Sequence, residues 1–299
     1  MDTKEIKSKF PIFKNKINGK QLVYLDSANS SQKPKTVIDR ISKFYSQEFS
    51  NVGRSVHSLG VTATNRFEET RDLMQKYINA KSREEIIFTK NATEAINLVA
   101  STYGEKFIES GDEILITELE HHANYVPWHF IREKKGAIIK FAKCNERGEV
   151  DIDEIKKLIT NKTKIIAVTH ISNVTGAIMP IKKIVDLASQ KKIPVLVDGC
   201  QGAPHVKIDM QEFGCDFYAI SCHKMYGPTG VGVLYAKKKW LEVLPPYQGG
   251  GGMIEEVKKD NITFPGSPTK YEAGTLQTAE VVGFSESIKF IDEVGIKNI

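Results

Sequence analysis

The chain has 299 residues, which is long for a single small module and predicts about two domains. Hydrophobic residues make up 40% and charged residues 26% of the sequence, and this composition excludes a disordered or fibrous protein. The formal charge of +5 is mild and the lysines are spread out, so nucleic acid is not predicted as a partner. Every apolar run falls far short of the ~20 residues that a membrane helix needs, so no membrane association is predicted.

The cysteines and the N-terminal segment predict a cytoplasmic protein. Cys144, Cys200, Cys215 and Cys222 show no C-x-x-C pairing, which fits a reduced compartment better than a disulfide framework. The first residues mix Asp, Glu and Lys and contain no long apolar stretch, so no secretory signal is predicted.

Short apolar runs alternate with amphipathic stretches along most of the chain. Seven runs predict strands, at residues 85–89, 113–117, 138–142, 164–169, 194–198, 216–221 and 231–235. Helical patterns fall between them at residues 94–103, 126–135, 152–159 and 181–190. This alternation predicts an α/β fold, in which a mainly parallel seven-stranded sheet is covered by helices on both faces.

Ligands in open α/β sheets bind beyond the carboxyl ends of the strands, so polar residues there are candidates for a site. Asp198 ends the fifth run, and a carboxylate at the mouth of a buried strand needs a cationic or donor partner. Lys224 follows the sixth run, close to Ser221 and His223, where an amine could react with a carbonyl compound. Taken alone, Asp198 is better interpreted as a helix cap or loop-bracing residue, and Lys224 as an ordinary surface lysine.

Two further strand ends lead into candidate residues. Thr93 follows the first run at a helix start, where a hydroxyl and backbone N–H groups can bind phosphate, although capping is the commoner use. His121 and His122 follow the second run, but sequence neighbours rarely bind one ion, and no zinc-like spacing links them to other ligands. No metal site is therefore predicted, and His121 is interpreted either as an imidazole facing a planar ligand or as a solvated loop residue.

Together these residues would supply a phosphate anchor, a stacking partner, a carboxylate and a reactive amine at one edge of the sheet. That set matches the cofactor pyridoxal 5'-phosphate, for which a protein provides a lysine and an acidic partner for the ring nitrogen. The sequence therefore predicts a pyridoxal phosphate site.

Seven motifs in chain order resemble the class V aminotransferase-like enzymes of fold type I, and specifically the cysteine desulfurases of the SufS group. They are YLDSA (24–28), NATEAINL (91–98), EHHAN (120–124), HISNVTG (170–176), VDGCQ (197–201), SCHKMYGPTG (221–230) and YEAGT (271–275). The resemblance covers the chain from residue 24 to its end.

The resemblance implies a role for each residue that faces the cofactor ring. Lys224 would hold pyridoxal phosphate covalently and shuttle the α-proton of the substrate, while Asp198 would pair with the pyridine nitrogen. Gln201 would hydrogen-bond the ring hydroxyl, and His121 would stack on the ring and act in acid–base steps.

The resemblance also implies phosphate and substrate contacts. Thr93, Ser221 and His223 would hold the phosphate, and Asn173 would contact the substrate carboxylate or the edge of the cofactor. Thr275 would reach the phosphate of the neighbouring subunit's cofactor, so a homodimer is implied.

The same resemblance implies the domain organisation. Residues 18–285 would form the pyridoxal-phosphate-binding large domain, and residues 1–17 and 286–299 would be a remnant of the small domain. In this family the nucleophilic cysteine and a substrate-binding arginine lie in the C-terminal segment. The chain is therefore expected to be a C-terminally truncated fragment that ends before both.

The implied reaction removes sulfur from L-cysteine, giving L-alanine and an enzyme persulfide for iron–sulfur cluster assembly. A sulfur-acceptor protein is a further expected partner. Two alternatives stay open: a selenocysteine lyase acting on L-selenocysteine, and a non-catalytic truncated protein that only binds the cofactor.

Overall fold

A single seven-stranded sheet forms the centre of the molecule. The computed structural model describes residues 2–53 and 55–299. The strands are β3 (Ile86–Thr89), β4 (Glu113–Thr117), β5 (Ile138–Ala142), β6 (Thr163–Thr169), β7 (Val195–Asp198), β8 (Phe217–Ser221) and β9 (Gly232–Ala236). Their order is β3-β9-β8-β7-β6-β4-β5, and only β9 runs antiparallel to its neighbours. The predicted mainly parallel sheet of seven strands is confirmed, and each predicted strand overlaps an observed one.

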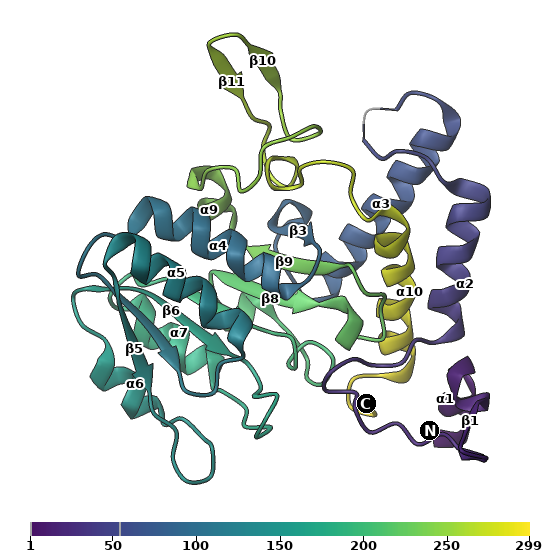
Figure 1. The fold of residues 1–299 in the computed structure, drawn as a ribbon, viewed down its shortest axis with the longest axis horizontal. Coiled ribbons are helices and arrows are strands. Elements are labelled where there is room, and N and C mark those ends of the chain that lie inside the picture. Colours follow the sequence, from purple (N-terminus) through teal and green to yellow (C-terminus); the bar gives the residue numbers. More distant parts are fainter. Residues whose placement is uncertain (1, 54) are drawn as a thin grey trace.

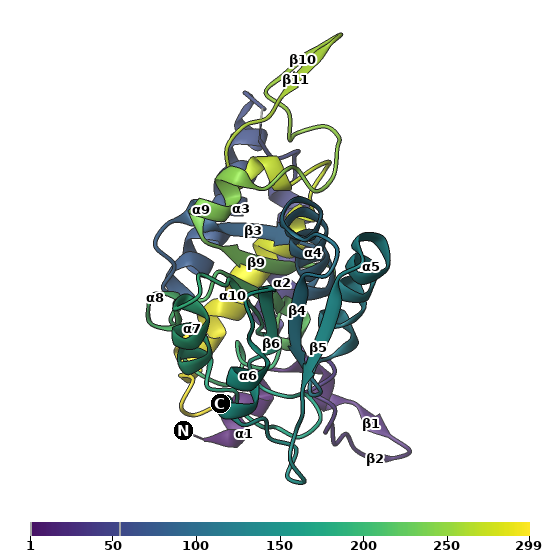
Figure 2. The ribbon, with the colours of Figure 1, turned by 90° about the vertical axis from the view of Figure 1, so that its left-hand side faces the viewer.

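Helices cover both faces of this sheet, as predicted (Figures 1 and 2). One face is covered by α4 (Ala92–Phe107), α5 (Val126–Lys135) and α9 (Lys238–Val243). The other face is covered by α3 (Ser58–Tyr77), α6 (Ile152–Leu158), α7 (Ile181–Ser189) and α10 (Thr278–Val294). Strand side chains alternate between the two cores: Ile165 packs with the α4 face, and Ile166 with the α7 face. A strand buried on both sides is apolar at most positions, which explains why the strands read as nearly continuous apolar runs.

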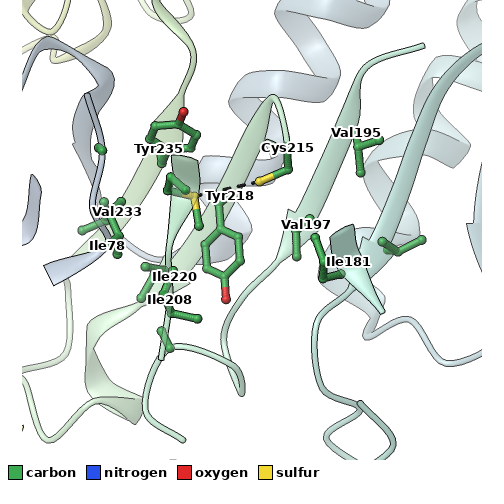
Figure 3. Packing of buried hydrophobic residues seen from close by; sticks show 14 of the residues in the cluster. Ile78, Ile181, Val195, Val197, Ile208, Cys215, Tyr218, Ile220, Val233 and Tyr235 are labelled. Carbon is green, nitrogen blue, oxygen red and sulfur yellow. Dashed lines mark hydrogen bonds between the residues drawn. The ribbon is translucent and has the colours of Figure 1, made fainter. Parts of the chain in front are cut away.

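Figure 3 shows part of the core on the α7 face. Val197 of β7, Tyr218 and Ile220 of β8 and Val233 of β9 lie side by side there, and all four are fully buried. The strands whose ends form the site are thus held in one packed layer.

Three helices of the α3 side were not among the four predicted helical stretches. These are α2 (Lys35–Lys43), α3 and α10, and α10 packs against both of the others. Helix α10 is continuous from Thr278 to Val294, so the predicted domain boundary between residues 285 and 286 falls inside it. The division into a large domain and a small-domain remnant stays a prediction.

The N-terminal segment lies against the end of α10. Phe10 stacks edge-on against Phe290, with ring centroids 5.4 Å apart, and also contacts Tyr226. The remaining elements are short: α1 (Thr3–Ser8), η1 (Pro11–Lys14), β1 (Lys16–Ile17), β2 (Lys20–Gln21), η2 (Phe44–Glu48), η3 (Arg83–Glu85), η4 (His122–Asn124), α8 (Met210–Phe213), η5 (Cys222–Lys224), β10 (Glu256–Lys258), β11 (Asn261–Thr263) and η6 (Thr269–Tyr271). The β10–β11 hairpin projects away from the body of the molecule (Figure 1). Within residues 2–53 and 55–299, no helix combines the length and apolarity needed to cross a membrane.

Candidate active site

A pocket of ≈ 240 Å³ opens where the carboxyl ends of β3, β4, β6, β7 and β8 meet. Its lining contains eight of the nine residues predicted for the site: Thr93, His121, Asn173, Asp198, Gln201, Ser221, His223 and Lys224. The fold therefore brings together side chains that lie up to 131 positions apart in the sequence, because parallel strands end at one edge of the sheet.

Asp198 places a carboxylate in the floor of this pocket. It is the last residue of β7, and only 4% of it is exposed. Its Oδ1 accepts a hydrogen bond from the backbone N–H of Cys200 at 3.0 Å, which fixes the turn that follows the strand. A carboxylate offers about four acceptor positions, so this one keeps capacity for a donor in the pocket. A buried carboxylate of this kind favours a cationic ligand group.

Gln201 joins the pocket to the N-terminal part of the chain. Its side-chain amide donates to the backbone carbonyl of Ala28 at 2.6 Å. The neighbouring Asn29 also lines the pocket. The segment around residues 28–29 is thereby held at the pocket entrance.

Lys224 and His223 lie in η5, the tight turn that follows β8. The N-terminal segment stabilises this turn, because the carbonyl of His223 accepts hydrogen bonds from the backbone N–H of Ser31 at 3.1 Å and from Lys33 Nζ at 2.9 Å. Burial, together with the charges of Lys224 and Lys33, lowers the pKa of His223. Lys224 is half-buried and lines the pocket together with His223.

The N-terminus of α4 forms another wall. Asn91 caps this 16-residue helix by accepting from the N–H of Glu94 at 2.9 Å. Ser221, at the end of β8, accepts from the N–H of Ala92 at 2.9 Å and so ties the helix start to the sheet. Thr93 follows in the first helical turn with an exposed side chain. A helix N-terminus beside hydroxyl groups is suited to an anion such as phosphate.

His121 stands at the pocket edge, in the loop after β4. Its Nδ1 accepts from the backbone N–H of Ala123 at 3.1 Å, so the neutral ring carries its proton on Nε2. Partial burial lowers the pKa of His121; the charges of Lys224 and His122 lower it further, whereas Asp198 raises it. The imidazole is therefore neutral at pH 7.

Asn173 and Thr275 differ in their relation to the pocket. Asn173 is exposed, lies in the loop after β6 and lines the pocket. Thr275 is exposed and lies in a separate depression beside Glu94 and Gln248, outside the lining of this pocket. The predicted contact of Thr275 with a neighbouring subunit stays a prediction.

Several lining residues were not singled out from the sequence. Apart from Asn29, described above, they are Asn91, Ala92, Ala123, Thr169, Ile171 and Cys200. All of them lie within a few residues of a strand end, and this position is the signal that could have identified them. Burial, followed by the charge of Asp198, raises the pKa of Cys200 well above that of a free thiol, so this cysteine stays protonated at pH 7.

The sequence profile of class-V aminotransferases matches residues 23–299, nearly the whole chain. The chain belongs to the class-V aminotransferase family. The chain is 46% identical over 299 residues to a probable cysteine desulfurase of Halalkalibacterium halodurans, covering all of this chain and 74% of that relative. It is 45% identical over 298 residues to a probable cysteine desulfurase of Mycolicibacterium paratuberculosis, covering all of this chain but only 44% of that relative.

The fold shows the same relationship. The chain superposes on the crystal structure of the cysteine desulfurase CsdA from Escherichia coli with a TM-score of 0.92 and 37% identity. That superposition covers all of this chain and 73% of the Escherichia coli chain. The resemblance to cysteine desulfurases of this family is thus confirmed, whereas the SufS group and the truncation stay predictions. Among the residues that the structure describes, no group of three or more His, Cys, Asp or Glu could hold a metal ion.

Proposed function

We propose that this chain forms the cofactor- and substrate-binding part of a pyridoxal-phosphate-dependent cysteine desulfurase. The overall reaction removes sulfur from L-cysteine and gives L-alanine and an enzyme persulfide for iron–sulfur cluster assembly. The observation that supports the proposal most directly is the convergence of Lys224, Asp198, His121 and the N-terminus of α4 on one pocket.

The residues of the pocket fit pyridoxal phosphate. The buried carboxylate of Asp198 suits a protonated pyridine nitrogen, and the α4 N-terminus with Thr93, Ser221 and His223 suits the phosphate. When bound, pyridoxal phosphate supplies an electron sink for bond cleavage at the substrate carbon. Lys224 would hold the cofactor covalently.

The chain's own side chains would then orient the substrate and move its protons. Lys224 Nζ is the base proposed to move the α-proton of the amino acid, because it is the amine that lines the pocket. His121, neutral at pH 7 with its proton on Nε2, would stack over the cofactor, where its ring could donate and accept protons. Asn173, exposed at the pocket edge, would contact the substrate carboxylate or the edge of the cofactor, and Gln201 would hydrogen-bond the ring hydroxyl.

The cysteines of residues 1–299 do not fit the role of sulfur-accepting nucleophile. Burial raises the pKa of Cys200, Cys215 and Cys222, so all three stay as thiols at neutral pH. The fourth, Cys144, lies outside the pocket lining. We therefore propose that the nucleophile comes from polypeptide outside this range, and that a homodimer in the cytoplasm passes the sulfur to an acceptor protein.

Covalent capture of the cofactor tests the first part of the proposal. The chain is incubated with pyridoxal phosphate, reduced with borohydride and digested, and the labelled lysine is located by mass spectrometry. Label on Lys224, lost in Lys224→Ala, is the expected result. Lys33 is the matched control, since burial lowers its pKa to about 8 and makes it the strongest competing amine near the pocket. Label that follows Lys33 rather than Lys224 would contradict the proposal.

Exchange of the α-hydrogen tests the second part without a nucleophilic cysteine. In deuterated water, the chain loaded with pyridoxal phosphate should exchange the α-hydrogen of L-alanine, and the Lys224→Ala variant should not. Cofactor binding without exchange would support the non-catalytic alternative. The Kd of the loaded chain for L-cysteine is then compared with its Kd for L-selenocysteine. Tighter binding of L-cysteine supports the desulfurase, and tighter binding of L-selenocysteine supports the selenocysteine lyase.

A further inference from the structure

Glu120 lies directly before His121, but it is not among the residues that line the pocket. Its carboxylate is the meeting point of three donors from three different elements. Oε1 accepts from the hydroxyl of Thr117 at 2.6 Å and from the backbone N–H of Thr169 at 2.9 Å. Oε2 accepts from the side-chain amide of Asn124 at 2.6 Å.

These bonds connect the His121 loop to the ends of two strands of the sheet, β4 and β6. Thr117 ends β4, Asn124 ends η4 and Thr169 ends β6. Thr169 itself lines the pocket, so Glu120 ties the His121 loop to the end of the adjacent strand β6 in the same pocket.

The network continues away from the pocket into the core. Asn124 is fully buried, and its carbonyl oxygen accepts from the indole N–H of Trp128 at 3.2 Å. This bond fixes the orientation of the Asn124 amide, so that its NH₂ group must face Glu120. The backbone N–H of Asn124 also donates to the carbonyl of His121 at 2.8 Å.

We propose that Glu120 is a positioning residue, which fixes the His121 loop to the end of β6 so that the imidazole stands at the pocket. This inference builds on the proposed function, because it assigns the support of the residue that is to stack on the cofactor. Burial raises the pKa of Glu120, and the hydrogen bonds from Thr117, Asn124 and Thr169 oppose that shift because they stabilise the carboxylate form.

Glutamine is the sharpest substitution, because it keeps the shape of the side chain while it changes the charge and the hydrogen-bonding capacity. An amide offers one acceptor oxygen and one NH₂ group, whereas all three neighbours of Glu120 donate to it. If the NH₂ group takes the place of Oε1 it faces the N–H of Thr169, and in place of Oε2 it faces the amide of Asn124. Either orientation leaves at least one donor without a partner and loosens the loop.

The test measures the pKa of His121 by NMR in the full 299-residue chain, labelled at histidine and free of cofactor. In the wild-type chain this pKa lies below the ordinary value of about 6.5, because the ring is partly buried. Glu120→Gln should shift it upward toward about 6.5, because the released ring becomes solvated. Thr117→Val removes only one of the three donors and should give a smaller shift in the same direction.

Glu118→Gln is the matched control. Glu118 lies in the same loop, is exposed and accepts from the backbone N–H of Cys144 at 3.0 Å. This variant should leave the His121 titration unchanged. A Glu120→Gln chain with a lower melting temperature but an unchanged His121 pKa would overturn the proposal, because Glu120 would then serve stability alone. If Glu120→Gln does not fold, Thr117→Val decides: an unchanged His121 pKa in that variant overturns the proposal as well.

Titration with pyridoxal phosphate separates this proposal from the proposed function. The Kd measured from cofactor absorbance should rise on the order of tenfold in Glu120→Gln and stay constant in Glu118→Gln. A wild-type chain that binds no pyridoxal phosphate would refute the proposed function, and the His121 titration alone would then decide the role of Glu120.

Discussion

The ion pair between Arg71 and Glu272 offers the most quantitative test of the fold. Arg71 of α3 is 1% exposed and Glu272 is 8% exposed. The guanidinium donates to both carboxylate oxygens, at 2.8 and 2.9 Å, and Glu272 also accepts from the N–H of Phe88 at 2.7 Å. Although burial opposes the charge of Arg71, the carboxylates of Glu272 and Glu68 together raise its pKa above the ordinary value. The pair joins α3, β3 and the segment before α10.

Glu272→Gln removes the charge but keeps an oxygen that can accept from Phe88. Loss of one partner of a buried ion pair costs about 3–5 kcal/mol, because the other charge is left without compensation. Glu68, which accepts from Arg71 Nε at 3.0 Å, compensates partly, so we expect the lower end of that range, about 3 kcal/mol. At about 2 °C per kcal/mol for a chain of this size, the melting temperature should fall by about 6 °C.

Urea and thermal unfolding measure this change, followed by fluorescence of the two tryptophans and by circular dichroism. Glu68→Gln is the matched control: it removes the other carboxylate partner of Arg71, which is 34% exposed, and should cost at most about 1 kcal/mol. The double variant Arg71→Met with Glu272→Gln has no unpaired buried charge and should recover most of the loss. Equal costs for Glu272→Gln and Glu68→Gln would refute the reasoning.

Two further predictions concern the residues beneath the pocket. Burial lowers the pKa of His170 to about 4, from about 6.5 in an unfolded chain, so its contribution to stability is complete above pH 6.5 and is lost as the pH falls from 6.5 to 4. In urea, the free energy of unfolding should be lower at pH 4.5 than at pH 7 by up to about 3 kcal/mol. This difference should shrink in His170→Gln but not in the exposed control His122→Gln. An undiminished difference in His170→Gln would contradict the prediction. Gly199→Ala would place a Cβ 1.8 Å from the Tyr218 ring and should lower stability by about 1–3 kcal/mol, whereas Gly249→Ala meets nothing within 4 Å and should melt like the wild type. A normal melting temperature for Gly199→Ala would show that the ring and the turn are not in close contact.

The sheet could be predicted from the sequence because its strands, apart from the partly exposed edge strand β5, are buried on both faces. Strand β6 shows this well: its apolar residues alternate between two cores, so the run 164–169 marks the strand to within one residue. Helix α10 was harder, because Phe284 faces the sheet side while Ala279 and Val282 face α2 and α3. A helix buried on several sides shows no single apolar stripe, so periodicity alone does not mark it.

Site residues could be predicted where the residue type at a strand end by itself indicates a chemical role. Asp198 and Lys224 are of this kind, and the fold brings both to one pocket. Glu120 is different, because its significance depends on three donors that meet only after β4, η4 and β6 are in place. Thr275 could not be assigned a position in the pocket, since its predicted role requires a second copy of the chain.

The antiparallel strand β9 determines when the pocket can form during protein synthesis. It lies between β3 and β8, so β3, made early, has no neighbour in the sheet until residues 232–236 leave the ribosome. Gly232 of β9 also supports the start of α4, because a Cβ there would lie 2.4 Å from the backbone of Asn91. A nascent chain that has made Thr93, His121 and Asp198 therefore still lacks the strand against which the start of α4 packs. The part of the pocket at the N-terminus of α4 is completed only when a late strand is inserted beside an early one.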